Sequence, residues 1–177
     1  MSPAEFIQLK AFARVDGVLL ALVWTASFAL CMAGFASPML MMAGVVIAVC
    51  SPVFVWLRAR RFRDAVLDGA ISFLRAYSYV MLMFFYSAIL FALVQFVYFK
   101  FIDQGWMISK MREMMSSEEG MAVMQAYGMT DMMNESLSVI AGTRPIDYAL
   151  SNLTQNFCVG VIIALPLAAL VRRRKRT

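Results

Sequence analysis

The sequence predicts an all-α polytopic membrane protein, with four transmembrane helices and a short helical extracytoplasmic cap between the third and fourth. Of its 177 residues, 62% are hydrophobic and only 15% are charged, whereas soluble domains carry about 25% charged residues. Lipid can solvate this apolar exterior, which water cannot. The basic residues gather at the ends of apolar runs, where they would meet lipid headgroups. The length suits one bundle, so residues 1–177 are expected to form a single membrane domain.

Four apolar runs define the expected spans, because a helix needs roughly 20 apolar residues to cross the hydrocarbon. They cover residues 17–36, 39–57, 71–101 and 146–171. The third run is longer than required, so its first turns are expected in the membrane interface. The fourth has a polar first half, and Pro166 should bend it because proline removes one backbone hydrogen bond.

A cleavable signal peptide is the alternative for the first run. Residues 34–36, Gly-Phe-Ala, resemble a small-residue cleavage site. However, the segment before the run is long and contains Glu5 and Asp16, and the apolar stretch is longer than a usual signal core. These features favour a retained first helix.

The distribution of Lys and Arg predicts the orientation. One side of the four-span topology would hold twelve basic and four acidic residues, and the other side four basic and seven acidic residues. Cytoplasmic segments carry the excess of Lys and Arg. Both termini and the 58–70 loop are therefore expected in the cytoplasm, which agrees with an even number of spans.

The outer segment, residues 103–143, is expected to be helical. Ser116 to Glu119 has the spacing of a capping box, in which serine and glutamate satisfy each other's free amides. A short helix should follow and stop at Gly128. Thr130 is expected to cap a second helix that Gly142 ends.

Several motifs resemble one bacterial membrane-protein family, known as domain of unknown function 4199. They are residues 62–64 (FRD), 67–77 (LDGAISFLRAY), 95–99 (QFVYF), 125–129 (QAYGM) and 144–150 (RPIDYAL). The resemblance covers almost the whole chain, and it implies the four-span fold and a bacterial inner-membrane location. It supplies no reaction. It implies a partner of the polyprenol-phosphate glycosyltransferase class, and with it a role in envelope glycan assembly.

The first candidate site lies before the third span. Asp68, Ser72 and Arg75 would share one face if residues 68–77 are helical. The functional interpretation is a contact for a partner or for a lipid phosphate held by Arg75. The structural interpretation is a helix start, with a bend at Gly69 and an arginine that reaches the interface.

A second candidate pairs polar residues of the third and fourth spans. Gln95 would lie deep in the third span, and Ser151, Thr154 and Gln155 share one face of the fourth. They are expected to form interhelical hydrogen bonds, each worth about 0.6 to 2 kcal/mol. A substrate pathway is the alternative.

The remaining candidates are the basic tail and the methionines of the outer segment. Arg172, Arg173 and Arg174 should attract anionic lipid, at about 1 kcal/mol per basic residue. Nine of the sixteen methionines lie in the outer segment. They are expected to fill an adaptable apolar surface, with Cu(I) ligation as the alternative.

No catalytic apparatus is evident, so the sequence predicts no enzyme, no catalytic residue, no cofactor and no metal site. The chain has no histidine, and it lacks the nucleophile elbow, the P-loop and the metalloprotease motif. We expect an accessory or scaffold subunit in contact with membrane lipids and a membrane-protein partner. A small transporter or channel subunit that forms a homo-oligomer is the alternative, and an enzyme of lipid-linked substrates ranks third. No nucleic-acid partner is expected, because no reader domain accompanies the basic tail.

Overall fold

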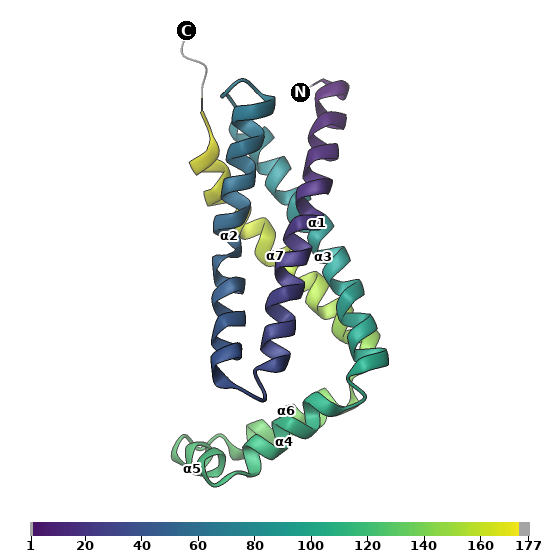
Figure 1. The fold of residues 1–177 in the computed structure, drawn as a ribbon, viewed down its shortest axis with the longest axis vertical. Coiled ribbons are helices and arrows are strands. Elements are labelled where there is room, and N and C mark those ends of the chain that lie inside the picture. Colours follow the sequence, from purple (N-terminus) through teal and green to yellow (C-terminus); the bar gives the residue numbers. More distant parts are fainter. Residues whose placement is uncertain (1, 174–177) are drawn as a thin grey trace. The chain divides into compact units, whose positions relative to one another are not determined.

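The computed structural model describes residues 2–173, which fold into seven α-helices and one π-helical turn (Figure 1). The elements follow the chain in the order α1 (Pro3–Ala33), α2 (Pro38–Val66), α3 (Phe73–Val97), η1 (Tyr98–Ile102), α4 (Trp106–Ser116), α5 (Glu118–Ala126), α6 (Thr130–Gly142) and α7 (Pro145–Val171). The prediction of an all-α fold is confirmed, with short helices between the third and fourth long ones.

Four of these helices are long and apolar enough to cross a membrane: α1, α2, α3 continued by η1, and α7. Each exceeds the roughly 20 residues that the hydrocarbon requires. The chain is therefore a multi-pass membrane protein. Helices α1 and α2 are longer than the predicted spans, since α1 begins at Pro3 and α2 continues to Val66. Helical hydrogen bonding does not stop where the side chains become polar, so the apolar runs mark only part of these two helices.

The start of α1 shows how a local motif extends a helix beyond its apolar run. Ser2 Oγ accepts a hydrogen bond from the amide of Glu5 at 3.3 Å, and Glu5 Oε2 accepts one from the amide of Ser2 at 2.7 Å. This reciprocal pair is a capping box, and Pro3 occupies the first helical turn, where its missing N–H is not needed. Polar residues near the N-terminus therefore begin a helix.

The chain divides into two compact units, which are described separately. The first unit comprises Met1–Leu93 and Ser151–Thr177, and the second comprises Val94–Leu150. The core of the first unit is built from buried apolar residues of all four long helices, among them Leu20, Val55, Met83 and Ala164. Aromatic pairs add to it, including Trp24 with Phe91 at a centroid distance of 5.8 Å.

Helices α1 and α2 lie side by side as an antiparallel hairpin (Figure 1). They come very close at Gly44, where a Cβ atom would lie 2.6 Å from Cys31 Sγ. The buried hydroxyl of Ser27 donates a hydrogen bond to the carbonyl of Gly44 at 2.8 Å. Small residues at a membrane helix interface allow such backbone contact.

One end of the first unit carries the N-terminal turns of α1, the loop 67–72 and the C-terminal end of α7. Buried Arg63 donates from Nη1 to the carbonyl of Val171 at 3.0 Å, one of the last carbonyls of α7. Ile71 and Arg173 form an isolated antiparallel bridge with two backbone hydrogen bonds of 2.9 and 3.2 Å. The end of α7 is thus tied both to α2 and to the loop. We refer to this end as the basic end.

The second unit depends on local caps rather than on a core. Asp103 accepts from the amides of Gly105 and Met107 at 3.1 and 3.0 Å, which caps the start of α4. Ser117 caps α5 by accepting from the amide of Gly120 at 3.1 Å. The predicted capping box does not form, because Ser116 is the last residue of α4 and the third residue of α5 is a glycine, which has no side chain to complete the pair. Thr130 lies within the first turn of α6 and does not cap it.

Candidate functional site

The first unit contains a buried ionic cluster that joins three helices. Asp16 of α1 is only 3% exposed. Its Oδ1 accepts hydrogen bonds from Nε of Arg58, at 2.8 Å, and from Nη2 of the same guanidinium in α2. Its Oδ2 accepts one from the hydroxyl of Tyr79 in α3. A buried carboxylate must be paired in this way, because an isolated charge in an apolar interior is strongly unfavourable.

Helix geometry explains why these three groups meet. Asp16 continues the buried face of α1 that Leu9 and Ala13 begin, at spacings of four and three residues. Next to it, Gly17 allows α3 to come so close that a Cβ atom would lie 2.8 Å from Tyr86 Cβ. The carboxylate is therefore held where the hydroxyl of α3 and the guanidinium of α2 can both reach it.

Aromatic side chains enclose the cluster. The ring of Phe62 stacks on the ring of Tyr79 with centroids 4.3 Å apart and planes 3° from parallel. Phe12 packs against Phe62 at 5.5 Å. Phe62 lies one helical turn after Arg58 on α2, so both face α1. These rings shield the ion pair from one side and raise the strength of its electrostatic interaction.

A pocket of about 310 Å³ opens beside the cluster, between α1 and α2. We call it the Arg58 pocket. Its lining consists of Phe12, Asp16, Arg58, Arg61, Phe62, Ala65 and Val66. The Arg58 side chain is 24% exposed, and Arg61 is exposed at the pocket. Two cations thus face a space whose other walls are mainly apolar, and the single carboxylate among them is already engaged.

The first predicted site residues are placed separately by the structure. Helix α3 begins at Phe73, so Asp68 does not share a helical face with the other two; it lies in the preceding turn at φ 50°. Ser72 Oγ accepts from the amide of Arg75 at 3.4 Å, in the position of an N-cap. Arg75 forms an ion pair with Glu5 of α1 at 3.2 Å. The geometry matches a helix start that is also tied to α1.

The polar residues of the third and fourth spans differ in burial. Gln95 is 5% exposed, and its Oε1 has no hydrogen-bond partner among residues 2–173. Ser151, Thr154 and Gln155 are all exposed on α7. They share one stripe of that helix, as their spacing predicted. We call these three residues the α7 polar stripe.

The basic tail is described in part. Arg172 and Arg173 are exposed, and the backbone of Arg173 forms the bridge to Ile71. Arg174 lies outside the described residues. The side chains that the structure does describe are therefore accessible at the basic end.

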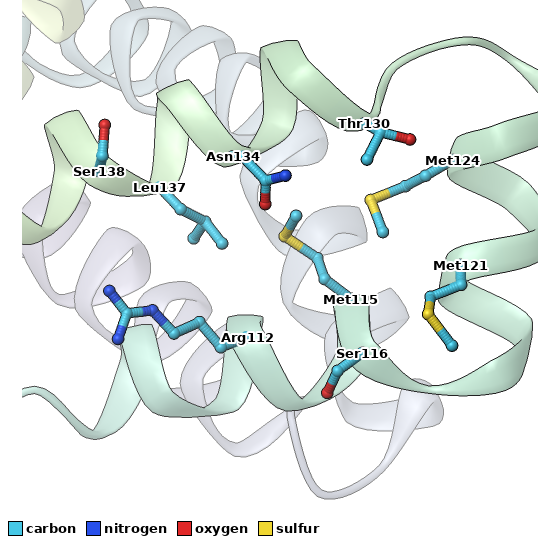
Figure 2. A pocket seen from close by; sticks show the side chains of 9 residues that line it. All are labelled: Arg112, Met115, Ser116, Met121, Met124, Thr130, Asn134, Leu137 and Ser138. Carbon is cyan, nitrogen blue, oxygen red and sulfur yellow. The ribbon is translucent and has the colours of Figure 1, made fainter.

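The second unit contains an apolar pocket of about 450 Å³ that is rich in methionine. Met115 from α4, Met124 from α5 and Leu137 from α6 point toward the same space, with Arg112 at its edge (Figure 2). The remaining lining residues are Ser116, Met121, Thr130, Asn134 and Ser138. The Cu(I) alternative stays a prediction, and the lining also suits a flexible apolar surface.

The ionic cluster was missed by sequence reasoning. Arg58 and Tyr79 enter the sequence analysis only through a charge count and an apolar run, and Asp16 enters it only through the charge count and the argument against a signal peptide. A signal was present, because Asp16 falls at the edge of the first apolar run and in register with its buried face. An ionisable residue in such a position usually faces the bundle interior and has a partner. Its partner could not be identified without the packing of α2 and α3.

Comparison with known proteins identifies a family and gives no chemistry. No curated protein and no solved structure matches the chain. Residues 16–173 match the family described as "Protein of unknown function (DUF4199)". The match begins at the buried aspartate and ends at the bridge between Arg173 and Ile71, so it includes α1 from Asp16 onward and the other three long helices in full. The chain therefore belongs to the DUF4199 family.

Proposed function

We propose that the protein is a non-enzymatic accessory or scaffold subunit that binds a partner membrane protein through the α7 polar stripe. The observation that carries this proposal is the exposure of Ser151 and Gln155 on a helix that is apolar enough to span a membrane. An amide exposed to hydrocarbon is unfavourable. A hydrogen bond to a partner helix removes that cost and contributes about 0.6 to 2 kcal/mol.

Photo-crosslinking in native membranes tests this proposal. A photoreactive amino acid at Gln155 should give an adduct with a protein, and the same group at Val49 of α2 should give lipid adducts only. Val49 is a suitable control because it is 72% exposed and apolar. An adduct of twice the mass would identify the partner as a second copy. Lipid adducts alone at both positions would refute the scaffold proposal.

The proposed partner class is an enzyme of envelope assembly, with a polyprenol-phosphate glycosyltransferase as the first candidate. This choice is supported only by the family resemblance of the motifs. Purification of the tagged protein from bacterial membranes in mild detergent should recover that enzyme, and the Gln155→Leu variant should recover less of it. Equal recovery of the enzyme with the unmodified protein and with Gln155→Leu would indicate that the interface does not include Gln155 of α7.

We also propose an inner-membrane location with both termini in the cytoplasm. The support is the basic end, where arginines gather beside the ends of α1, α2 and α7, together with the excess of basic residues in cytoplasmic segments. A reporter enzyme fused after Thr177 should be active only on the cytoplasmic side. Activity of a periplasmic reporter at that position would reverse the orientation.

A transporter or channel subunit is the second candidate, favoured by Gln95. A buried amide oxygen without a partner in the described chain suits a site that water or a solute visits. Single cysteines at Gln95, Ser151, Thr154 and Gln155 would distinguish the two, in a chain whose native cysteines are replaced. Reaction of position 95 with a water-soluble thiol reagent, at a rate well above that of buried Ala88, would favour the pathway. Protection of position 95 at the rate of Ala88 would favour the scaffold.

A further inference from the structure

We propose that the Arg58 pocket binds a phosphate group, presented by an anionic phospholipid at the membrane surface. This inference is independent of the α7 polar stripe and of the partner it would bind. It depends on three features of the pocket: a cation held in a fixed position, a second cation that is free, and apolar walls at the boundary of the hydrocarbon.

The first feature is the fixed position of Arg58. Its Nε and Nη2 donate to Asp16, so the plane of the guanidinium is set by a carboxylate that is itself held by Tyr79. Nη1 has no hydrogen-bond partner among the described residues. A guanidinium has five N–H donors in a rigid fork, and a phosphate accepts two of them side by side. Asp16 therefore orients Arg58 without using all of its donors.

The second feature is Arg61, which lines the same pocket. It is exposed and forms no ion pair with any residue that the structure describes. The neighbouring arginines differ in this respect, because Arg60 pairs with Asp64 at 3.7 Å and Arg63 with Asp64 at 2.7 Å. The pocket consequently carries two arginines against one carboxylate, which favours an anion.

The third feature is the amphipathic wall. Phe12, Phe62, Ala65 and Val66 supply apolar surface around the two guanidinium groups. Arg58 follows directly on Leu57, at the end of the apolar run of α2. A side chain at that point reaches the level of the lipid headgroups. A volume of about 310 Å³ lies at the small end of ligand pockets and suits a headgroup rather than a whole lipid.

Binding by the full-length protein in nonionic detergent tests this proposal. The probes are dihexanoyl phosphatidylglycerol, dihexanoyl phosphatidylcholine and inorganic phosphate, each titrated by calorimetry. Phosphatidylglycerol should bind more tightly than phosphatidylcholine, and Arg61→Gln should weaken its binding about tenfold, the loss of one charge-assisted contact. Arg58→Lys, which keeps the charge beside Asp16 but removes the fork, should also weaken binding.

Arg60→Gln is the matched control. It removes the same charge from the adjacent position of α2, but Arg60 lies over the ring of Trp56 and does not line the pocket. Its affinity for phosphatidylglycerol should stay within about twofold of the unmodified protein. Equal losses for Arg60→Gln and Arg61→Gln would overturn the proposal, because they would indicate general attraction to the basic end. The proposal would also be overturned if neither phosphatidylglycerol nor inorganic phosphate bound to the protein.

Phe12→Ala separates the two sources of phosphate. If the ligand is a lipid, this variant should bind phosphatidylglycerol more weakly and inorganic phosphate with unchanged affinity, because the apolar wall contacts only the lipid. If inorganic phosphate binds as tightly as the lipid and with the same dependence on Arg61, the phosphate site is supported and its ligand is the free ion. Circular dichroism of each variant should show an unchanged helical content.

Discussion

The two units of the chain differ in what stabilises each of them internally. The first has a continuous buried core and an ionic cluster in which one carboxylate joins α1, α2 and α3. In the second, α4 and α5 have no buried residue over their fully described lengths, and Leu137 is the buried residue of α6. Helices α4 and α5 begin instead at local caps, at Asp103 and Ser117.

This difference teaches where each unit should tolerate change. In the first unit, substitution of a single buried residue should be destabilising, because a carboxylate or a glycine there is in contact with other helices. Local caps make the second unit sensitive only at the caps themselves. Its methionine-lined surfaces can adapt to a ligand or a partner without disturbing a core. Three substitutions test this contrast, from the largest expected effect to the smallest.

Asp16→Leu should have the largest effect. The substitution leaves the guanidinium of Arg58 and the hydroxyl of Tyr79 without their buried acceptor. Removing one partner of a buried ion pair typically costs about 3–5 kcal/mol. The free energy of unfolding, measured by SDS titration of the purified protein in detergent micelles, should fall by that order.

The double variant Asp16→Leu/Arg58→Leu should recover much of this loss, since an apolar pair can replace a buried ionic one. Glu113→Leu in the second unit is the control, because it removes the exposed ion pair with Lys110 and should cause no measurable change. If Asp16→Leu were as mild as Glu113→Leu, the cluster would have no part in stabilising the first unit.

Gly44→Ala should have an intermediate effect. An added Cβ would lie 2.8 Å from the carbonyl oxygen of Ser27 and 2.9 Å from the amide nitrogen of Cys31, and backbone atoms cannot easily move aside. Overpacking of this kind costs about 1–3 kcal/mol. Gly142→Ala in the second unit has nothing within 4 Å of the added atom and should cause no loss. The midpoint temperature of thermal unfolding, measured in detergent, should therefore be lower for Gly44→Ala and unchanged for Gly142→Ala.

Most of the fold could be predicted from the sequence, because lipid imposes a simple composition on any helix that crosses it. The four long helices and the short ones between them followed from apolar length and from turn residues such as Gly128, whose φ is 62°. The exact helix ends did not follow, since α1 begins in a capping box well before its apolar run. The cap of α5 is displaced by one residue from the predicted position, and the predicted cap of α6 at Thr130 does not form.

The candidate site could be predicted only in part. That Ser151, Thr154 and Gln155 share one face followed from helical spacing, which depends on one helix alone, whereas their exposure did not follow. The Asp16 cluster needs three helices, whose residues lie 42 and 63 positions away from the aspartate. Sequence spacing carries no information about such contacts. Arg75 makes the same point, because its ion pair with Glu5 spans 70 positions.

Ser117→Ala should have the smallest effect and should be confined to α5. The hydroxyl satisfies the free amide of Gly120, and loss of an N-cap typically costs about 1 kcal/mol of helix stability. Hydrogen exchange of the amides in Glu118–Ala126 should become faster, while the unfolding of the first unit stays unchanged. Ser136→Ala in α6 is the matched control, because that hydroxyl donates to the carbonyl of Met132 within the helix and caps nothing. Equal acceleration in both variants would mean that α5 does not depend on its cap, and that the second unit has a source of stability beyond its local motifs.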